Sequence, residues 1–130
     1  YQGRVAAADI AGRHVRADYR AIPAVTFTDP QIASVGTTSG DDLVAARWRL
    51  PARLSTYERP RRDGFLKLFA DPERRVLVGA VAVGPEAGEW LQQLTLAIRA
   101  RVSVDVLRDT IQPYPTFSEA VYFAARELDL

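Results

Sequence analysis

The order of patterns along the sequence predicts an α+β fold, in which an antiparallel sheet of about four to five strands carries helices on one face. Apolar segments with strand-like character come first, and segments with helical spacing follow them. The regular alternation of strand and helix that builds a parallel sheet is missing. With 130 residues, 48% of them apolar, the chain has the size of one domain with its own core.

The clearest strand is predicted at residues 46–54, where apolar and polar residues alternate strictly. The apolar side comprises Ala46, Trp48, Leu50, Ala52 and Leu54, and the other side Arg47, Arg49, Pro51 and Arg53. Such alternation is typical of a strand with one buried and one solvated face. Because Pro51 cannot donate a hydrogen bond to a neighbouring strand, we expect this strand at an edge of the sheet.

Four further strands are predicted, two of them as a hairpin. Residues 65–70 and 76–83 are apolar on both faces, which favours central positions, and an Asp-Pro turn joins them. Residues 23–27 and 32–35 are shorter apolar segments, separated by an Asp-Pro pair. We also expect Asp41 or Asp42 to cap one helical turn over residues 43–45.

Helices are predicted at the start of the chain and again after the hairpin. Residues 1–13 read as an alanine-rich helix, followed by a polar linker over residues 15–21. A longer helix is expected to start at Gly84-Pro85-Glu86, with its apolar stripe on the sheet. That stripe comprises Ala87, Trp90, Leu91, Leu94, Ala97, Ile98 and Arg101.

A short helix over residues 104–111 is expected next, then an extended Pro-Tyr-Pro elbow at 113–115. The Thr-x-x-Glu pattern of residues 116–119 predicts a capping box for the last helix. Phe117, Tyr122 and Phe123 lie outside the apolar stripe of that helix, so we interpret them as a surface for a partner; the alternative is that they belong to the core of the chain itself.

Composition excludes several classes of function. The 17 basic and 16 acidic residues balance to a net charge of +1, so neither a nucleic-acid surface nor a membrane surface is indicated. With no cysteine and only His14 as histidine, we expect no metal site. There is no Gly-rich dinucleotide or phosphate loop, and position 1 is not methionine, so we expect a piece of a longer protein rather than a complete enzyme.

Three segments together resemble a known family. They are residues 22–36, the glycine- and alanine-punctuated region from 64 to 98, and the Pro-Tyr-Pro-Thr-Phe-Ser-Glu segment at 113–119. In this order they are similar to the C-terminal dimerisation domain of the pyridine nucleotide–disulfide oxidoreductases, which include dihydrolipoamide dehydrogenase, glutathione reductase and mercuric reductase. The resemblance spans residues 20 to 128.

This resemblance implies a homodimeric parent enzyme that passes electrons from NAD(P)H through FAD to a disulfide, a quinone-like molecule or a metal ion. Residues 1–20 would be the tail of the last FAD-domain helix plus a linker, and residues 21–130 the dimerisation domain. The FAD and NAD(P)H domains and a redox cysteine pair would lie upstream, so no cofactor is expected on this segment alone. The family also implies a cytoplasmic location.

The implied site lies at the third segment. Disulfide-reducing members carry His-Pro-Thr followed by a glutamate, and the histidine serves as acid–base. Tyr114 stands where that histidine would be, and Glu119 keeps the place of the glutamate. The resemblance therefore implies Tyr114 and Glu119 as catalytic residues, with Pro115 and Thr116 beside the cofactor.

Structural interpretations of the same residues stay open. Tyr114 can be an ordinary half-buried tyrosine in a proline-rich elbow, and Glu119 can act mainly as the capping partner of Thr116. For the whole chain, the alternative is a stand-alone interaction module with this fold and no catalytic role.

Overall fold

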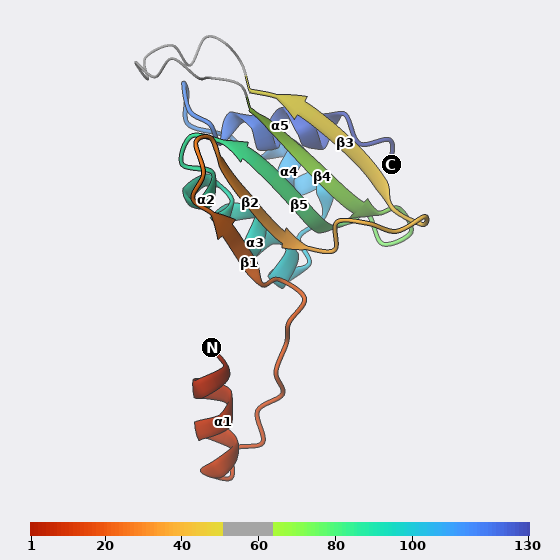
Figure 1. Cartoon of the computed structure of the whole chain (residues 1–130). Helices are drawn as coiled ribbons and strands as arrows, with labels where there is room; N and C mark the ends of the chain where they lie inside the picture. Colours follow the sequence, from red (N-terminus) through yellow and green to blue (C-terminus); the bar gives the residue numbers. More distant parts are fainter. Residues whose placement is uncertain (51–63) are drawn as a thin grey trace.

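The computed structural model describes residues 1–50 and 64–130, which form a five-stranded sheet and helices on one side of it (Figure 1). The strands are β1 (Pro23–Thr26), β2 (Gln31–Gly36), β3 (Val44–Arg49), β4 (Phe65–Asp71) and β5 (Val76–Gly84). The helices are α1 (Gln2–Ile10), α2 (Ala87–Trp90), α3 (Gln92–Ala100), α4 (Val104–Asp109) and α5 (Glu119–Arg126). The predicted α+β class is confirmed.

All neighbouring strands pair antiparallel, in the order β1-β2-β5-β4-β3. The hairpin of β4 and β5 occupies the centre, as its two-sided apolar pattern predicts. Its turn is held by Asp71, whose carboxylate accepts hydrogen bonds at 3.0 Å from the backbone N–H groups of Glu73 and Arg74. The strand containing Trp48 lies at one edge, with Arg47 and Arg49 exposed, also as predicted.

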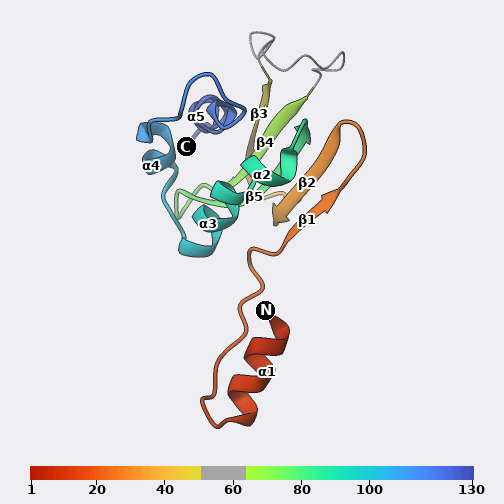
Figure 2. The ribbon, with the colours of Figure 1, turned by 90° about the vertical axis from the view of Figure 1, so that its left-hand side faces the viewer.

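One face of the sheet packs on helices α2 to α5 (Figure 2). The sheet side of this core includes Ala33, Val35, Leu66, Leu68, Ala80 and Ala82, all at most 1% exposed. Because β5 presents alanines at its centre, the helix layer can pack closely on the sheet without leaving a gap. Leu91, Leu94 and Ile98 supply the helix side of the contact.

Truncating Leu94 is expected to destabilise the domain strongly. The side chain of Leu94 is fully buried, whereas Leu96 on the same helix is 66% exposed. Leu94→Ala should lower the free energy of unfolding by about 2–5 kcal/mol, because it removes buried methyl groups and leaves a cavity. Leu96→Ala, the matched control, should change it by less than about 0.5 kcal/mol. Urea denaturation of both variants checks this, and equal effects would show that the stripe is not core.

The helical turn predicted over residues 43–45 is wrong. Val44 and Ala45 begin β3 instead, and they pair with Ala70 and Phe69 of β4. A non-local strand partner therefore overrides the local capping signal. The last part of the strand predicted at residues 46–54, namely residues 51–54, lies outside the described residues.

The long helix predicted here is divided into α2 and α3 at Leu91, and it differs from its prediction at both ends. Glu86 is the N-cap, in the left-handed region with φ 53°, and the helix starts after it at Ala87. At the other end, Arg101 is the left-handed C-cap with φ 54° and is exposed. It does not lie on the buried stripe, because the helix has already ended there. Helix α4 likewise ends at Asp109 rather than at residue 111.

Helix α1 stands away from the sheet at the end of an extended linker (Figure 1). None of its residues is buried. The linker is tied to α3 by Asp18, whose carboxylate lies 2.8 Å from the guanidinium of Arg99.

The aromatic residues interpreted as surplus on α5 contact their own domain. Phe123 stacks on Trp48 of β3 with ring centroids 4.8 Å apart, and Phe117 stacks on Trp90 at 6.4 Å. Tyr122 and Phe123 meet edge to face. All three side chains are half-buried. Two of these rings thus have an intrachain role that the helical stripe alone does not indicate.

Candidate functional site

The elbow that joins α4 to α5 carries the residues predicted as a site. Pro113, Tyr114 and Pro115 are exposed, and the side chain of Tyr114 is 71% exposed. The peptide bond between Tyr114 and Pro115 is cis. The fold therefore presents a phenol at the surface, on a segment whose backbone two prolines restrict.

Behind the exposed phenol, Glu119 is buried at the first turn of α5 and only 8% exposed. Its Oε2 accepts a hydrogen bond at 3.3 Å from the backbone N–H of Thr116. This is one half of the predicted capping box. In place of the other half, the Thr116 hydroxyl donates to the Pro113 carbonyl oxygen at 2.6 Å. Both hydrogen bonds close the elbow on itself and fix its shape relative to α5.

A stack of two aromatic rings supports the elbow from below. Phe117 packs on Trp90 of α2, and the indole N–H of Trp90 donates at 3.0 Å to the carbonyl oxygen of Pro85. Because Trp90 is buried and hydrogen-bonded, it provides a rigid base for the chain that follows Tyr114. The elbow is thus anchored both to α5 and to the helix after β5.

A cavity of about 460 Å³ lies beside the elbow, between the end of α4 and α5. Glu119 is the predicted site residue that lines it, together with Arg108, Gln112, Tyr122 and Arg126. The side-chain nitrogen of Gln112 is buried and has no hydrogen-bond partner in the part of the chain that the structure describes. Sequence reasoning missed Arg108 and Gln112, because a single arginine or glutamine on a short helix or loop carries no spacing signal.

Arg108 fixes the far end of α5. Its guanidinium donates to the carbonyl oxygens of Ala125 at 2.9 Å and Leu128 at 2.6 Å, and it lies 3.3 Å from the carboxylate of Asp105. The Ala125 carbonyl is one that a helix C-terminus leaves without an intrahelical partner, and Leu128 follows the end of the helix. A hydrogen bond from the Arg75 side chain to Asp105 is the main reason that the pKa of Asp105 is lowered. The network therefore joins the β4–β5 hairpin, α4 and α5.

The hydrogen bonds of Arg108 to the Ala125 and Leu128 carbonyls form a clamp on the end of α5, and removing this clamp is expected to destabilise the domain. Arg108→Ala should lower the free energy of unfolding by about 1–3 kcal/mol, because it leaves half-buried carbonyl oxygens without a donor. Arg126 is also on α5 but exposed, with its guanidinium on the Tyr122 hydroxyl at 2.5 Å. The control Arg126→Ala should therefore cost less than about 1 kcal/mol. Thermal or urea unfolding of the two variants measures the difference, and an equal loss would remove the clamp role.

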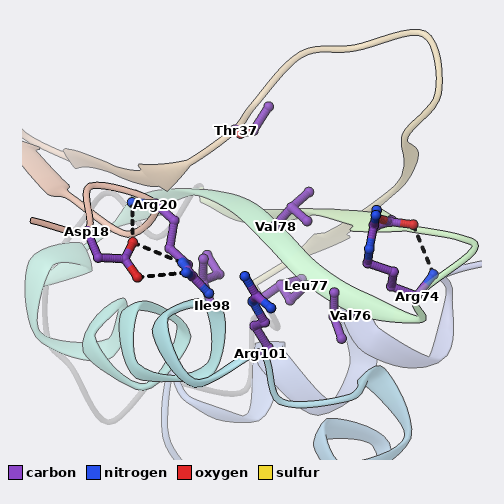
Figure 3. A pocket seen from close by; sticks show the side chains of 10 residues that line it. Asp18, Arg20, Thr37, Arg74, Val76, Leu77, Val78, Ile98 and Arg101 are labelled. Carbon is purple, nitrogen blue, oxygen red and sulfur yellow. Dashed lines mark hydrogen bonds and ion pairs between the residues drawn. The ribbon is translucent and has the colours of Figure 1, made fainter. Parts of the chain in front are cut away.

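A second hollow lies at the start of β5 (Figure 3) and is lined by no residue of the elbow. Its apolar wall includes Val76 and Ile98. Its acids are neutralised by its arginines: Asp18 lies 2.7 Å from Arg20, and Asp71 lies 2.6 Å from Arg74. The pKa of Asp18 is lowered, mainly because its carboxylate accepts a hydrogen bond from the backbone N–H of Arg20. This hollow contains none of the predicted site residues.

Within residues 1–50 and 64–130, no group of three or more potential ligands is placed to hold a metal ion. The same part of the chain contains no helix long and apolar enough to cross a bilayer.

Comparison with known proteins identifies the family to which this sequence and fold are similar. Residues 22–125 match the family described as "Pyridine nucleotide-disulphide oxidoreductase, dimerisation domain". The chain is 40% identical to dihydrolipoyl dehydrogenase of Geobacillus stearothermophilus, over 96% of this chain and 28% of that protein. It is also 40% identical to the Halobacterium salinarum enzyme of the same name, over 95% of this chain and 27% of that protein. The chain thus spans just over a quarter of the length of these relatives.

Solved structures agree with the sequence match. The crystal structure of LpdA from Mycobacterium tuberculosis superposes with a TM-score of 0.80 and 33% identity, covering 96% of this chain and 29% of that one. The flavoprotein disulfide reductase RclA from Escherichia coli has a TM-score of 0.80 at 22% identity, over 95% of this chain and 30% of that one, and supports the fold alone. The five-stranded antiparallel sheet, its helix layer and the matched sequence together show that the chain belongs to the pyridine nucleotide-disulphide oxidoreductase family, as its dimerisation domain.

Proposed function

We propose that this domain pairs with a second copy and completes the active site of an FAD-dependent NAD(P)H oxidoreductase. The other parts of that enzyme, the FAD and NAD(P)H domains, precede it in the same polypeptide, and residues 1–20 are the end of the FAD domain and its linker. The location we propose for the enzyme is the cytoplasm.

The exposed phenol of Tyr114 is the observation that carries this proposal. Two hydrogen bonds and an aromatic stack hold the elbow in place, yet the side chain of Tyr114 at its centre is 71% exposed. A fixed but exposed polar side chain is what an active-site residue supplied to another subunit requires. Tyr114 and Glu119 are the proposed catalytic pair.

The elbow suits a flavin as neighbour. The phenol can donate a hydrogen bond to a carbonyl oxygen or ring nitrogen of the isoalloxazine, and Pro115 offers an exposed apolar surface beside it. The N–H and hydroxyl of Thr116 already donate within the elbow, so Thr116 contributes by fixing its shape. FAD, when bound, supplies the electron transfer between NAD(P)H and the acceptor.

Tyr114 supports a proposal about the class of electron acceptor. A phenol exchanges its proton poorly at neutral pH, so lipoamide or glutathione reduction of the usual kind is disfavoured. A phenol still positions an acceptor by hydrogen bonding, which suits a quinone-like molecule, whose carbonyl oxygens accept hydrogen bonds. A disulfide or a metal ion is the second class of acceptor.

Expression of the complete reading frame tests the proposal. The protein should purify as a yellow flavoprotein dimer that oxidises NADH or NADPH, and quinones should turn over faster than lipoamide or glutathione disulfide. A frame without an upstream dinucleotide-binding motif, or a product without flavin, would instead support the stand-alone interaction module. Comparing the acceptors in one assay separates the three acceptor classes.

A further inference from the structure

On the face of the sheet opposite the helices, the central strands carry apolar residues where a solvated face would be polar. The strand register aligns three rows across it. The first row is Ala45, Phe69, Gly79 and Gly36; the second is Arg47, Lys67, Val81, Ser34 and Ala24; the third is Arg49, Phe65, Val83, Ile32 and Thr26. Figure 2 shows helices α2 to α5 on the other side of the sheet and α1 standing apart from it. We refer to these three rows as the open face.

Antiparallel sheets with one solvated face normally alternate apolar and polar residues. Here β5 directs Val81 and Val83 to the open face, and neighbouring β2 adds Ile32, which is 46% exposed. The sequence of the central strands is therefore that of a sheet covered on both sides, although its own helices cover one.

The charges of the open face are all positive and lie on its β3–β4 side. Arg47 and Lys67 are directly opposed in the strand register, an arrangement that destabilises an isolated pair of strands. Each cation lies over an aromatic ring: Arg47 is 4.1 Å from the ring centre of Phe65, and Lys67 is 4.7 Å from that of Phe69. Among the described residues, neither cation has a carboxylate partner.

The nearest acid in the same strand does not compensate these charges. Asp71, at the hairpin end of β4, is bound to Arg74 and to the backbone of the turn. Two opposed cations, with no acid in the described rows, form a site whose charge a carboxylate would complement.

We infer that the open face is the seat of another domain of the same polypeptide, whose contact surface has an apolar centre and a carboxylate between Arg47 and Lys67. This inference rests on the proposed function, in which further domains precede this one. Most of the length of the relatives lies outside the matched region, so such polypeptide is available. The apolar centre would cover Val81, Val83 and Ile32.

The chemistry of the face disfavours other occupants. A second copy that docked through the same face around a two-fold axis running across the strands would bring Arg47, Arg49 and Lys67 of each copy close to like charges. Stacking of nucleic-acid bases is disfavoured because Arg47 already covers the Phe65 ring and Phe69 is only 6% exposed.

Thiol labelling of the full-length protein tests the inference. The 130 residues contain no cysteine, so Ala45→Cys on the open face and Ala100→Cys at the end of α3 place single probes at two positions that are exposed in this structure. Each rate of maleimide labelling is measured on the peptide carrying the probe and divided by its rate in denaturant. We expect the Ala45→Cys probe to label at least about tenfold more slowly than the Ala100→Cys probe, because a docked domain must open first.

Charge reversal and salt test the carboxylate. Adding Arg47→Glu to the Ala45→Cys protein should restore fast labelling, and so should high salt in the unreversed protein, since both weaken the ion pair. Arg101→Glu, which reverses an exposed arginine away from the face, should change nothing. Labelling of the unreversed Ala45→Cys protein at high salt tests the carboxylate even if the charge-reversed variant fails to fold.

Several results would overturn the inference. Equal labelling of the two probes would show a solvated face, and protection insensitive to both salt and Arg47→Glu would exclude the carboxylate. Protection lost on dilution would assign the face to a second copy, and protection that needs an added oligonucleotide would assign it to nucleic acid. Labelling needs no catalysis, so a protected face in a protein without NAD(P)H oxidation would contradict the proposed function and leave this inference standing.

Discussion

Replacing Tyr114 with histidine in the full-length protein is expected to raise its disulfide reductase activity by about 10²–10⁴-fold, the usual effect of general acid–base catalysis. An imidazole titrates near pH 6.5 and can exchange protons at neutral pH, whereas a phenol holds its proton until about pH 10. The elbow around position 114 is fixed by bonds that do not involve that side chain, namely those of Thr116 to Glu119 and to Pro113. Steady-state kinetics with lipoamide and glutathione disulfide measure the change.

The control, Tyr114→Phe, removes one neutral hydrogen bond worth about 0.5–1.5 kcal/mol, which corresponds to a loss of roughly 2- to 13-fold in kcat/KM. A much larger loss would show that the phenol itself transfers a proton. If neither variant changes the rate with any acceptor, we would interpret Tyr114 as an exposed tyrosine of the elbow without a catalytic role.

Gly79→Ala is expected to destabilise the domain by more than about 3 kcal/mol, enough to leave little folded protein in a domain of ordinary stability. Gly79 lies in central strand β5, opposite Gly36, and a Cβ there would overlap the backbone carbonyl of Thr37. Thr37 cannot move away cheaply, because its N–H donates to the carbonyl oxygen of Val78 at 2.9 Å. Circular dichroism during urea titration would show a weakened or absent cooperative transition.

Gly3→Ala provides the matched control. Gly3 lies within α1, and a Cβ at this position meets nothing within 4 Å. Alanine should therefore be neutral or stabilising there by roughly 0.5–1 kcal/mol, as expected for a helix interior. Normal folding of the Gly79→Ala variant would mean that β5 and the chain at Thr37 are further apart than described.

The sequence predicts the sheet well because its strands carry local signals. The alternation around Trp48 identifies an edge strand, and the two-sided apolar runs of residues 65–70 and 76–83 identify the centre. It fails at Val44 and Ala45, because their strand character comes from pairing with β4, which no local pattern records. It also misreads Phe117 and Phe123, whose stacking partners Trp90 and Trp48 lie far away in the chain.

The candidate site divides in the same way. The Thr-x-x-Glu pattern predicts the contact between Thr116 and Glu119, which the structure forms at 3.3 Å. Two other hydrogen bonds have backbone oxygens as acceptors. The Thr116 hydroxyl donates to the carbonyl of Pro113, and Arg108 donates to the carbonyl of Leu128 after α5. Every residue carries such an oxygen, so the sequence holds no mark of which one is used.

The strand order also divides the sheet into two sections that differ in how their contacts are spaced along the chain. β3, β4 and β5 follow one another in sequence and in space, and β1 pairs with β2 across a short turn. These two sections meet along the β2–β5 ladder, whose paired residues, such as Gln31 and Gly84, are far apart in sequence. That ladder is the natural boundary of partial unfolding. Detachment of β1 and β2 as one unit would expose the edge of β5 while the clamped α4–α5 side stays folded, so this boundary sets where the domain opens first.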